Sequence, residues 1–510
     1  MKLSKVNSAE LEGIGARLID VEVDLNVGLH SFNIVGLADK SLNEARERVN
    51  SALKNSGFKP PNRENRKIIV NLAPAEIKKT GSQYDLAIAV GYLLATGQIK
   101  NFEVKNKIFI GELALDGSLR PINGALNIAQ MAAQKGIEFL FLPEFNAQEA
   151  AAIKNIKIVP LKNLKQLVEF LEEKISIEFQ NFELPNFQNF GQVDFSEIKG
   201  QENAKRALTI AAAGGHNLLM VGSPGVGKSL LAKALISILA PLTLEESIEI
   251  TKIWSAAGLI LDGLIKERPF REPHQTASPV SIIGGGANPK PGEISLAHNG
   301  ILFLDEFPEF RRDLLEALRA PLENGYVHIS RAKNSLVFPS KFTLVAAMNP
   351  CPCGYFGDPE KRCTCSAYDI IRYNKKISGP LLDRIDLQIY VQRIKVSELR
   401  SFKNSQSESS IVREKVILAR NRQAERFKKL NLSNKNIRLN SQMSSRQCEE
   451  LIRLTPDGEK FLSTLDKSFI SPRGYYRLLK TAQTIADLEN SDKVSGDYLA
   501  EAFSYRIREK

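Results

Sequence analysis

The spacing of apolar residues changes several times along the chain, and each change predicts a different element. From Ile19 to Leu25, apolar residues occupy every second position, as expected for a half-buried strand. Residues 42–53 follow with helical spacing, residues 67–72 predict another strand, and residues 84–96 another helix. We therefore expect a compact α/β domain over residues 1–175. Its Gly13-Ile14-Gly15 segment has no predicted strand before it, and we assign it no function.

A second kind of strand is continuously apolar, which is typical of central parallel strands covered on both faces. Such runs occupy residues 218–221, 300–304 and 342–348. They predict a parallel-sheet α/β core over residues 194–398. Residues 176–193 are polar and aromatic without a clear period and read as a linker, whereas residues 399–510 predict a helical domain.

The first apolar run leads into a glycine-rich loop of the pattern GxxxxGK[ST], and an apolar segment with helical spacing follows. This strand–loop–helix context is the one that a phosphate-binding loop requires. Its backbone N–H groups would surround the phosphates of ATP, Lys228 would reach the β- and γ-phosphates, and Ser229 would ligate Mg²⁺. The predicted nucleotide-binding residues are Gly222, Ser223, Pro224, Gly225, Val226, Gly227, Lys228 and Ser229.

The second apolar run ends in two carboxylates, Asp305 and Glu306. Downstream of a phosphate-binding loop, such a strand is expected to flank the same nucleotide. Asp305 would then hold Mg²⁺ through water, and Glu306 would orient and polarise the attacking water. The sequence therefore predicts ATP hydrolysis.

Charge and composition narrow the class of partner. The formal net charge is +11, and residues 391–440 contain 13 Lys/Arg but only 4 Asp/Glu, a local net of +9. This stretch is either a solvated basic helix or a contact surface for nucleic acid. No apolar run approaches the roughly 18 residues that a membrane span needs. The first residues lack a signal-peptide pattern, so we expect a cytoplasmic protein without a membrane partner.

Four of the five cysteines fall within 15 residues, as two CxC pairs: Cys351, Cys353, Cys363 and Cys365. Four thiols so grouped in a reducing compartment suggest a tetrahedral Zn²⁺ site. A redox-sensitive thiol group and a packed loop are the alternatives. Cys448 is isolated, and we expect it to be inert.

The motifs MVGSPGVGKS, ILFLDEFPEF, AAMNPCPCG and ISGPLLDRIDL occur together, and on them the chain resembles magnesium-chelatase-like AAA+ ATPases of the ComM/YifB type from end to end. The resemblance implies an AAA+ core with a C-terminal helical lid, assembled as a homo-oligomer, most often a hexamer. It also implies a motor that drives branch migration or strand separation of DNA in recombination and natural transformation. The alternatives are a metal-chelatase motor subunit and an ATP-regulated protease.

The same resemblance suggests roles for residues outside the phosphate-binding loop. Asn349 matches sensor 1, Arg384 the arginine finger that reaches a neighbouring subunit, and Arg473 sensor 2 in the lid. Ile198, Gly200 and Gln201 match the adenine-contacting segment. Hairpins within residues 268–300 and 326–338 match pore hairpins, and the second carries Arg331 and Lys333 at its tip. These two residues would suit contact with a DNA backbone, although a solvated turn is equally consistent.

The first domain resembles a Lon-protease-type domain, most clearly over Ile108–Pro143. Lon peptidases use a serine nucleophile with a lysine base. Here Gln83 occupies the serine position, and Leu126 or Asn127 occupies the lysine position. Ser82 would replace the nucleophile only in a slipped register. We therefore expect a structural or regulatory domain rather than a peptidase.

Overall fold

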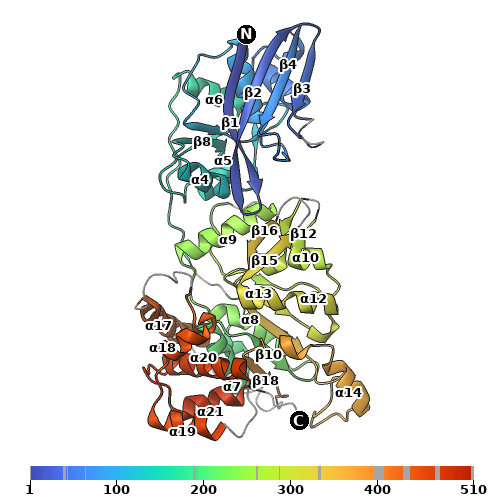
Figure 1. Ribbon diagram of the computed structural model, residues 1–510, viewed down its shortest axis with the longest axis vertical. Helices are drawn as coiled ribbons and strands as arrows, with labels where there is room; N and C mark the ends of the chain where they lie inside the picture. The colour runs from blue at the N-terminus through green and yellow to red at the C-terminus, as the bar shows by residue number, and fades with distance from the viewer. Residues whose placement is uncertain are drawn as a thin grey trace.

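The computed structural model is elongated, with the N-terminal domain at one end and the C-terminal helices at the other (Figure 1). It describes residues 2–37, 39, 42, 44–63, 65–187, 191, 193–259, 262–286, 288–330, 335–394, 407–428, 437–465 and 471–506. None of the helices among these residues is both long and apolar enough to span a bilayer.

The N-terminal domain has a four-stranded sheet of order β1-β2-β4-β3 and a parallel sheet of order β5-β8-β9. The first sheet consists of β1 (Lys2–Glu12), β2 (Gly15–Val27), β3 (Ser31–Val35) and β4 (Arg66–Ala73), and the second of β5 (Lys107–Phe109), β8 (Phe139–Pro143) and β9 (Lys157–Leu161). The remaining elements are α2 (Ala45–Asn55), η1 (Pro61–Arg63), α3 (Asp85–Thr96), β6 (Glu112–Leu113), β7 (Leu119–Arg120), α4 (Ala125–Gln134), α5 (Glu144–Ala150) and α6 (Leu164–Leu171). The predicted α/β domain is therefore present. No helix or strand follows α6 among the described residues of the predicted linker.

The sequence pattern predicts only one of the two strands of the long β1–β2 hairpin. Strand β1 precedes Gly13 and pairs with β2 along its whole length, from Lys2 opposite Leu25 to Glu12 opposite Gly15. The expectation that no strand precedes Gly13 is wrong, because the buried positions of β1 include small and polar side chains such as Ser8 and Glu10. These residues produce no apolar alternation. Gly13 and Ile14 form the turn of this hairpin.

The central core is a parallel sheet of order β11-β14-β17-β10-β18, as the continuous apolar runs predict. Its strands are β10 (Leu218–Val221), β11 (Phe270–Arg271), β14 (Ile301–Leu304), β17 (Thr343–Met348) and β18 (Leu387–Tyr390). Around it lie η2 (Phe195–Glu197), α7 (Glu202–Gly214), α8 (Lys228–Ile238), α9 (Leu244–Ala257), α10 (Pro279–Ile283), α11 (Glu293–Leu296), η3 (Phe307–Glu309), α12 (Arg312–Ala317), α13 (Arg319–Asn324), α14 (Ala367–Asn374) and α15 (Gly379–Leu382). Two hairpins, β12 (Gly284–Gly285) with β13 (Lys290–Pro291) and β15 (Tyr326–Ser330) with β16 (Ser335–Pro339), extend from the core.

The C-terminal helices pack directly on the core and share its hydrophobic interior. They are α17 (Glu408–Lys428), η4 (Asn440–Gln442), α18 (Ser445–Leu451), α19 (Pro456–Thr464), α20 (Pro472–Leu488) and α21 (Gly496–Ser504). Leu478, Ala482 and Ile485 of α20 belong to the same buried cluster as Leu208 of α7. A buried hydrogen bond between His216 Nε2 and Thr484 Oγ1, 2.8 Å long, joins the start of β10 to α20.

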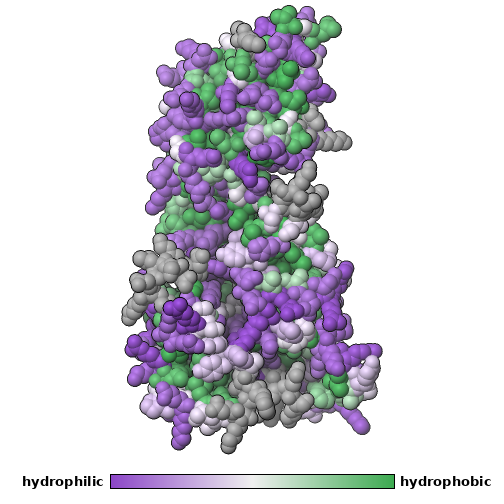
Figure 2. All heavy atoms as spheres, viewed as in Figure 1, coloured by the Kyte–Doolittle hydropathy of each residue, from purple (hydrophilic) through white to green (hydrophobic). Residues whose placement is uncertain are grey.

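The N-terminal domain docks on the core through α4 and through the β1–β2 turn (Figure 1). Asn127 Nδ2 donates to the carbonyl of Lys252 in α9 at 3.2 Å, and the Gly124 N–H donates to Ser255 Oγ at 2.9 Å. Ile14 packs in the apolar cluster that also contains Leu336 of β16. At the other end of β2, Figure 2 shows apolar surface, where the Val27 side chain is almost fully exposed.

Candidate functional site

The predicted nucleotide-binding residues lie together at the carboxyl edge of the central sheet. Strands β10, β14 and β17 are parallel neighbours, so the segments that follow them meet at one edge. The phosphate-binding loop follows β10, Asp305 and Glu306 follow β14, and Asn349 follows β17. Together they line a cavity of about 700 Å³. This size is typical of small-molecule sites.

Lys228 begins α8 and is folded back over the loop. Its Nζ donates to the carbonyls of Gly222 and Ser223 at 2.6 and 3.1 Å and to Asn349 Oδ1 at 3.0 Å. Burial lowers the pKa of Lys228, while Asp305 and Glu306 counteract that shift. The ammonium thus occupies a position in which phosphate oxygens would replace carbonyl oxygens as its acceptors.

Ser229 and Asp305 form the oxygen pair expected at a Mg²⁺ site. Ser229 Oγ donates to Asp305 Oδ2 at 2.7 Å, and the other carboxylate oxygen accepts the Glu306 N–H at 2.8 Å. Oxygen ligands of this kind suit Mg²⁺. Glu306 adopts a left-handed backbone with φ of 50°, which is uncommon for a residue with a side chain. Such strained positions cluster at functional sites, and this one lies at the mouth of the cavity.

Besides Leu230 of α8, four residues of the cavity wall have no role in the sequence prediction. They are Glu272, Pro273, His274 and Gln275, which follow β11. Strand β11 runs parallel to β14, so its carboxyl end reaches the same edge of the sheet. His274 Nδ1 lies 2.7 Å from Thr276 Oγ1, and its side chain is exposed beside the cavity. A strand of two residues gives no readable period, and for that reason the pattern did not reveal this wall.

The adenine-contacting segment lies at the neighbouring strand. Gln201 Nε2 donates to the Gln392 carbonyl at 2.6 Å, and the preceding residue, Val391, lies against Gly222 of the phosphate-binding loop. Ile198 is 5% exposed and belongs to the hydrophobic core, so little of its surface is available to a base. The adenine role of Ile198, Gly200 and Gln201 stays a prediction.

Arg384 and Arg473 lie at the opposite, amino edge of the sheet. The carbonyl of Arg384 accepts a 2.9 Å hydrogen bond from Asn217, the residue that precedes β10. Both guanidinium groups contact the same carboxylate: Arg384 pairs with Glu323, and Arg473 lies 2.9 Å from its other oxygen. The structure therefore separates these two arginines from the phosphate-binding loop of their own subunit.

Around this arginine pair, a basic cavity of about 890 Å³ lies between the core and part of the C-terminal region. Figure 2 shows a hydrophilic hollow between α13 and α20. The other basic side chains in its wall are Arg268, Lys341, Arg420, Arg438, Arg477 and Lys480. Acidic residues are fewer there, so the cavity favours an anion.

Many arginines of the basic stretch 391–440 have partners inside the protein. Arg426 pairs with the buried Asp487, Arg438 with Glu249, and Arg393 with Asp358. Within the described part of the stretch, these pairings with acidic residues elsewhere in the chain neutralise part of its positive charge. Arg331 and Lys333, at the tip of the β15–β16 hairpin, lie outside the described residues.

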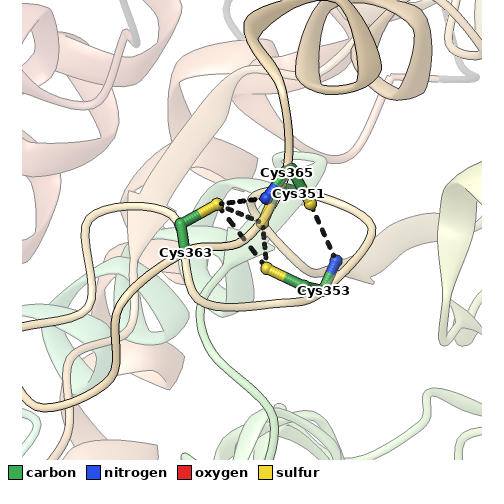
Figure 3. A group of neighbouring side chains, drawn as sticks. All are labelled: Cys351, Cys353, Cys363 and Cys365. Atoms are coloured by element: carbon green, nitrogen blue, oxygen red, sulfur yellow. Dashed lines mark hydrogen bonds between the residues drawn. The ribbon is translucent and has the colours of Figure 1, made fainter.

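The four cysteines of the CxC pairs converge (Figure 3). Their sulfur atoms all lie within 4.8 Å of one another, with Cys351–Cys353, Cys351–Cys363 and Cys353–Cys363 separations of 3.3, 3.7 and 3.6 Å. Backbone N–H groups point at the sulfurs, as from Phe356 to Cys351 at 3.3 Å. The amides of Thr364 and Tyr355 lower the pKa of the Cys353 thiol to about 5, whereas burial and the neighbouring thiols raise the pKa of Cys363 and Cys365. Of these three thiols, Cys353 is the one most readily converted to the thiolate, the form of cysteine that binds metal.

The peptidase positions of the N-terminal domain have other contacts. Ser82 Oγ donates to Glu112, and Gln83 Nε2 donates to Glu10 at 2.9 Å. Leu126 is buried in a small apolar cluster with Leu264 of the core. Asn127, as described above, bonds to the core across the domain contact. The position that would carry the lysine base thus joins two domains.

Comparison with known proteins identifies the family. Family models match residues 194–399 ("Magnesium chelatase, subunit ChlI"), 21–146 ("Subunit ChlI of Mg-chelatase") and 406–506 ("Magnesium chelatase, subunit ChlI C-terminal"). The competence protein ComM of Haemophilus influenzae is 43% identical over 512 residues, covering 99% of this chain and 98% of that protein. The chain belongs to the magnesium-chelatase-like AAA+ proteins of the ComM/YifB type.

Other relatives of this ComM/YifB-type chain extend the comparison. YifB of Salmonella typhimurium is 40% identical over 511 residues, covering 99% of this chain and 97% of that protein. The DNA replication licensing factor mcm6 of Dictyostelium discoideum is 28% identical over 215 residues, which is 39% of this chain and 22% of that protein. Membership of the AAA+ class implies the use of a nucleotide and Mg²⁺, in agreement with the residues at the carboxyl edge.

Proposed function

We propose that this chain is the subunit of an ATP-hydrolysing hexameric ring that acts on DNA in the cytoplasm, as a branch-migration helicase in recombination and natural transformation. One observation carries the proposal. The groups suited to ATP binding and water activation lie at one edge of the central sheet, whereas two arginines suited to γ-phosphate lie at the other.

Within one subunit, the carboxyl edge would bind MgATP. Loop N–H groups and the start of α8 stabilise the phosphates, because both direct partial positive charge at them. Lys228 exchanges its carbonyl partners for the β- and γ-phosphates, and Ser229 with Asp305 holds Mg²⁺. Glu306 accepts a proton from the attacking water, and Asn349 positions that water against the γ-phosphate.

Arg384 would complete the site of a neighbouring subunit. From Asn217, beside Arg384, to Gly222 the chain advances five residues along β10, roughly 16 Å at strand rise. An arginine side chain does not span this distance, so its partner nucleotide belongs to another copy. Arg473 shares the position and is assigned the same role. A head-to-tail contact that repeats with a rotation that closes generates a ring. The subunit number of six follows the family resemblance.

DNA is proposed as the substrate from the relatives and from the β15–β16 hairpin. One relative is named a competence protein and another a DNA replication licensing factor. The hairpin tip contains Arg331 and Lys333, two cations suited to a phosphate backbone. An ATP-regulated protease is less favoured, since Ser82 is bonded to Glu112 and the lysine position of a peptidase is Leu126 or Asn127. A metal-chelatase motor is less favoured because that role needs partner subunits and because this chain carries a fused Lon-like N-terminal domain.

Zn²⁺ is the metal proposed for the four cysteines. With Zn–S bonds of about 2.3 Å, the sulfurs of a tetrahedral site lie roughly 3.8 Å apart. The three separations among Cys351, Cys353 and Cys363, 3.3–3.7 Å, are close to this value, and all four sulfurs lie within 4.8 Å of one another. Bound Zn²⁺ would cross-link residues 351–365 into one rigid loop, and the N–H groups that point at the sulfurs would stabilise the ligands.

The test compares ATP hydrolysis with branched DNA, with porphyrin plus Mg²⁺, and with unfolded protein. The proposal expects stimulation by DNA alone, and strand displacement that is lost in both Lys228→Ala and Glu306→Gln. Absence of DNA binding at low salt would refute the DNA motor, and stimulation by porphyrin or unfolded protein would favour the corresponding alternative.

Subunit mixing tests the shared site separately. Glu306→Gln and Arg384→Ala proteins should each be inactive, because each lacks one half of every site. In an equimolar mixed ring, about a quarter of the interfaces regain both intact halves, so about a quarter of the wild-type rate should return. A mixture that stays inactive, although the subunits co-assemble, would place Arg384 outside the catalytic site.

A further inference from the structure

The cysteine loop, residues 351–365, is in direct contact with the phosphate-binding loop. A Cβ placed on Gly354 would lie 2.6 Å from Pro224 Cδ, so the backbone between the two CxC pairs packs against the second turn of the phosphate-binding loop. Gly354 has a φ of 86°, which a residue with a side chain would adopt only under strain. This close packing leaves no space for movement of one loop without the other.

A second contact is polar and charged. Asp358 lies between the CxC pairs; its side chain has no solvent exposure, and Arg393 Nε donates to it at 2.8 Å. Ser223 of the phosphate-binding loop lies beside this carboxylate, and Ser223, backbone amides and Arg393 hold the pKa of Asp358 well below its usual range. Asp358 therefore remains an anion beside Ser223 of the nucleotide site at any pH near neutrality.

A third connection runs through the chain itself. Cys351 is two residues after Asn349, whose Oδ1 accepts from Lys228 Nζ. A restraint on Cys351 would therefore also restrain the end of β17 and the side-chain amide of Asn349, which we predict to lie near the γ-phosphate. Metal at the four sulfurs (Figure 3) would restrain residues 349, 354 and 358 together, the three points at which this segment meets the nucleotide site.

We propose that the metal-bound cysteine loop is a structural wall of the nucleotide site, so that loss of Zn²⁺ from Cys351, Cys353, Cys363 and Cys365 weakens ATP binding through Gly354 and Asp358. The inference rests on the proposed Zn²⁺ site and on ATP binding at the phosphate-binding loop. Without the metal, four adjacent thiols and thiolates do not attract one another, and the loop loses the cross-link that presses it against Ser223 and Pro224.

The experiment measures two quantities on the full chain: Zn²⁺ content by mass spectrometry and the Kd of a fluorescent ATP analogue. Cys363→Ser should lose Zn²⁺ and bind the analogue about tenfold more weakly, the effect of removing one charge-assisted hydrogen bond. Asp358→Asn should keep Zn²⁺ and show a similar loss. Cys448→Ser, which removes a buried cysteine elsewhere, is the matched control and should change neither quantity.

A double-mutant cycle distinguishes this coupling from local damage. Cys363→Ser made in the Asp358→Asn background should weaken binding little further, because both changes remove the same contact. Unchanged affinity in Asp358→Asn, or additive losses in the double variant, would overturn the coupling and leave the Zn²⁺ site standing. Wild-type protein that neither contains nor takes up Zn²⁺ would overturn the inference while the ATPase proposal stands. Wild-type protein that binds no nucleotide would overturn the proposed function itself.

Discussion

Glu149 is a buried acid at the contact between the N-terminal domain and the core, and replacing it should stabilise the protein. Its side chain is 1% exposed. Asn146 Nδ2 donates to Oε1 at 3.0 Å, Ser255 of the core lies nearby, and the buried Oε2 has no hydrogen-bond partner. Burial raises the pKa of Glu149 to about 7. The neutral, protonated form is therefore favoured in the folded protein.

The pH dependence of the free energy of unfolding follows from the difference between the pKa of Glu149 in the folded and in the unfolded protein. Below pH 4.5 the carboxyl is protonated in both states, so it contributes no pH-dependent term. Between pH 4.5 and 7 the unfolded state loses its proton first, and the free energy of unfolding falls with rising pH. Above pH 7 both states have lost the proton, and the free energy of unfolding falls no further on account of Glu149. The shift from 4.5 to about 7 corresponds to about 3 kcal/mol at about 1.36 kcal/mol per unit.

Glu149→Gln keeps the shape of the side chain and removes its ionisable carboxyl group. Thermal unfolding of wild-type and variant protein from pH 5 to 8.5 should show little difference at pH 5. By pH 7.5 the variant should melt roughly 6–12 °C higher, at about 2–4 °C per kcal/mol for a domain of this size. Glu144→Gln is the matched control on the same helix, because its side chain is exposed and pairs only weakly with Lys162. Parallel profiles for wild-type and Glu149→Gln, or a lower melting temperature of the variant at pH 8, would refute the reasoning.

Three further predictions concern other parts of the chain. Glu323→Gln should free Arg384 and Arg473 to reach the nucleotide of a neighbouring subunit. The ATP concentration for half-maximal assembly, measured by light scattering, should then fall about fivefold, the equivalent of about 1 kcal/mol. A rise in that concentration would mean that Glu323 holds the two arginines in the position that the neighbouring nucleotide needs. Asp487→Ala leaves Arg426 without its buried partner and should lower the free energy of unfolding by about 3–5 kcal/mol, seen as a lower melting temperature of the C-terminal helices. Asp492→Ala, which removes the exposed partner of Arg422, is its control. Ser82→Ala should leave ATPase and casein cleavage as in wild type, and loss of a cleavage activity would restore the peptidase alternative.

The sequence predicts the parallel core well because its strands are buried on both faces. Strands β10, β14 and β17 are each a continuous apolar run followed by polar functional residues, so the carboxyl edge could be assembled from Lys228, Asp305, Glu306 and Asn349 alone. The family and the fold class are confirmed, whereas the domain boundaries and the roles of individual site residues stay predictions.

What the sequence could not supply depends on long-range packing. Strand β1 uses small and polar residues in buried positions, and β11 is too short to show a period. Arg426 has its partner 61 residues away at Asp487, so its charge looked free in the sequence. Likewise, no pattern indicates that Arg384 and Arg473 meet at one carboxylate, because Glu323 belongs to a third segment.

The β1–β2 hairpin has a mechanical consequence for a ring motor. Its two strands are hydrogen-bonded in register from Lys2 to Glu12, so it is a stiff arm, and its tip at Ile14 is embedded beside Leu336 of β16. The β15–β16 hairpin leads directly to Arg331 and Lys333. If the β15–β16 hairpin moves during the ATP cycle, either the β1–β2 hairpin moves with it or the apolar contact between Ile14 and Leu336 is broken. In the proposed motor, the N-terminal domain would therefore move with the β15–β16 hairpin, and each step would tilt its sheet.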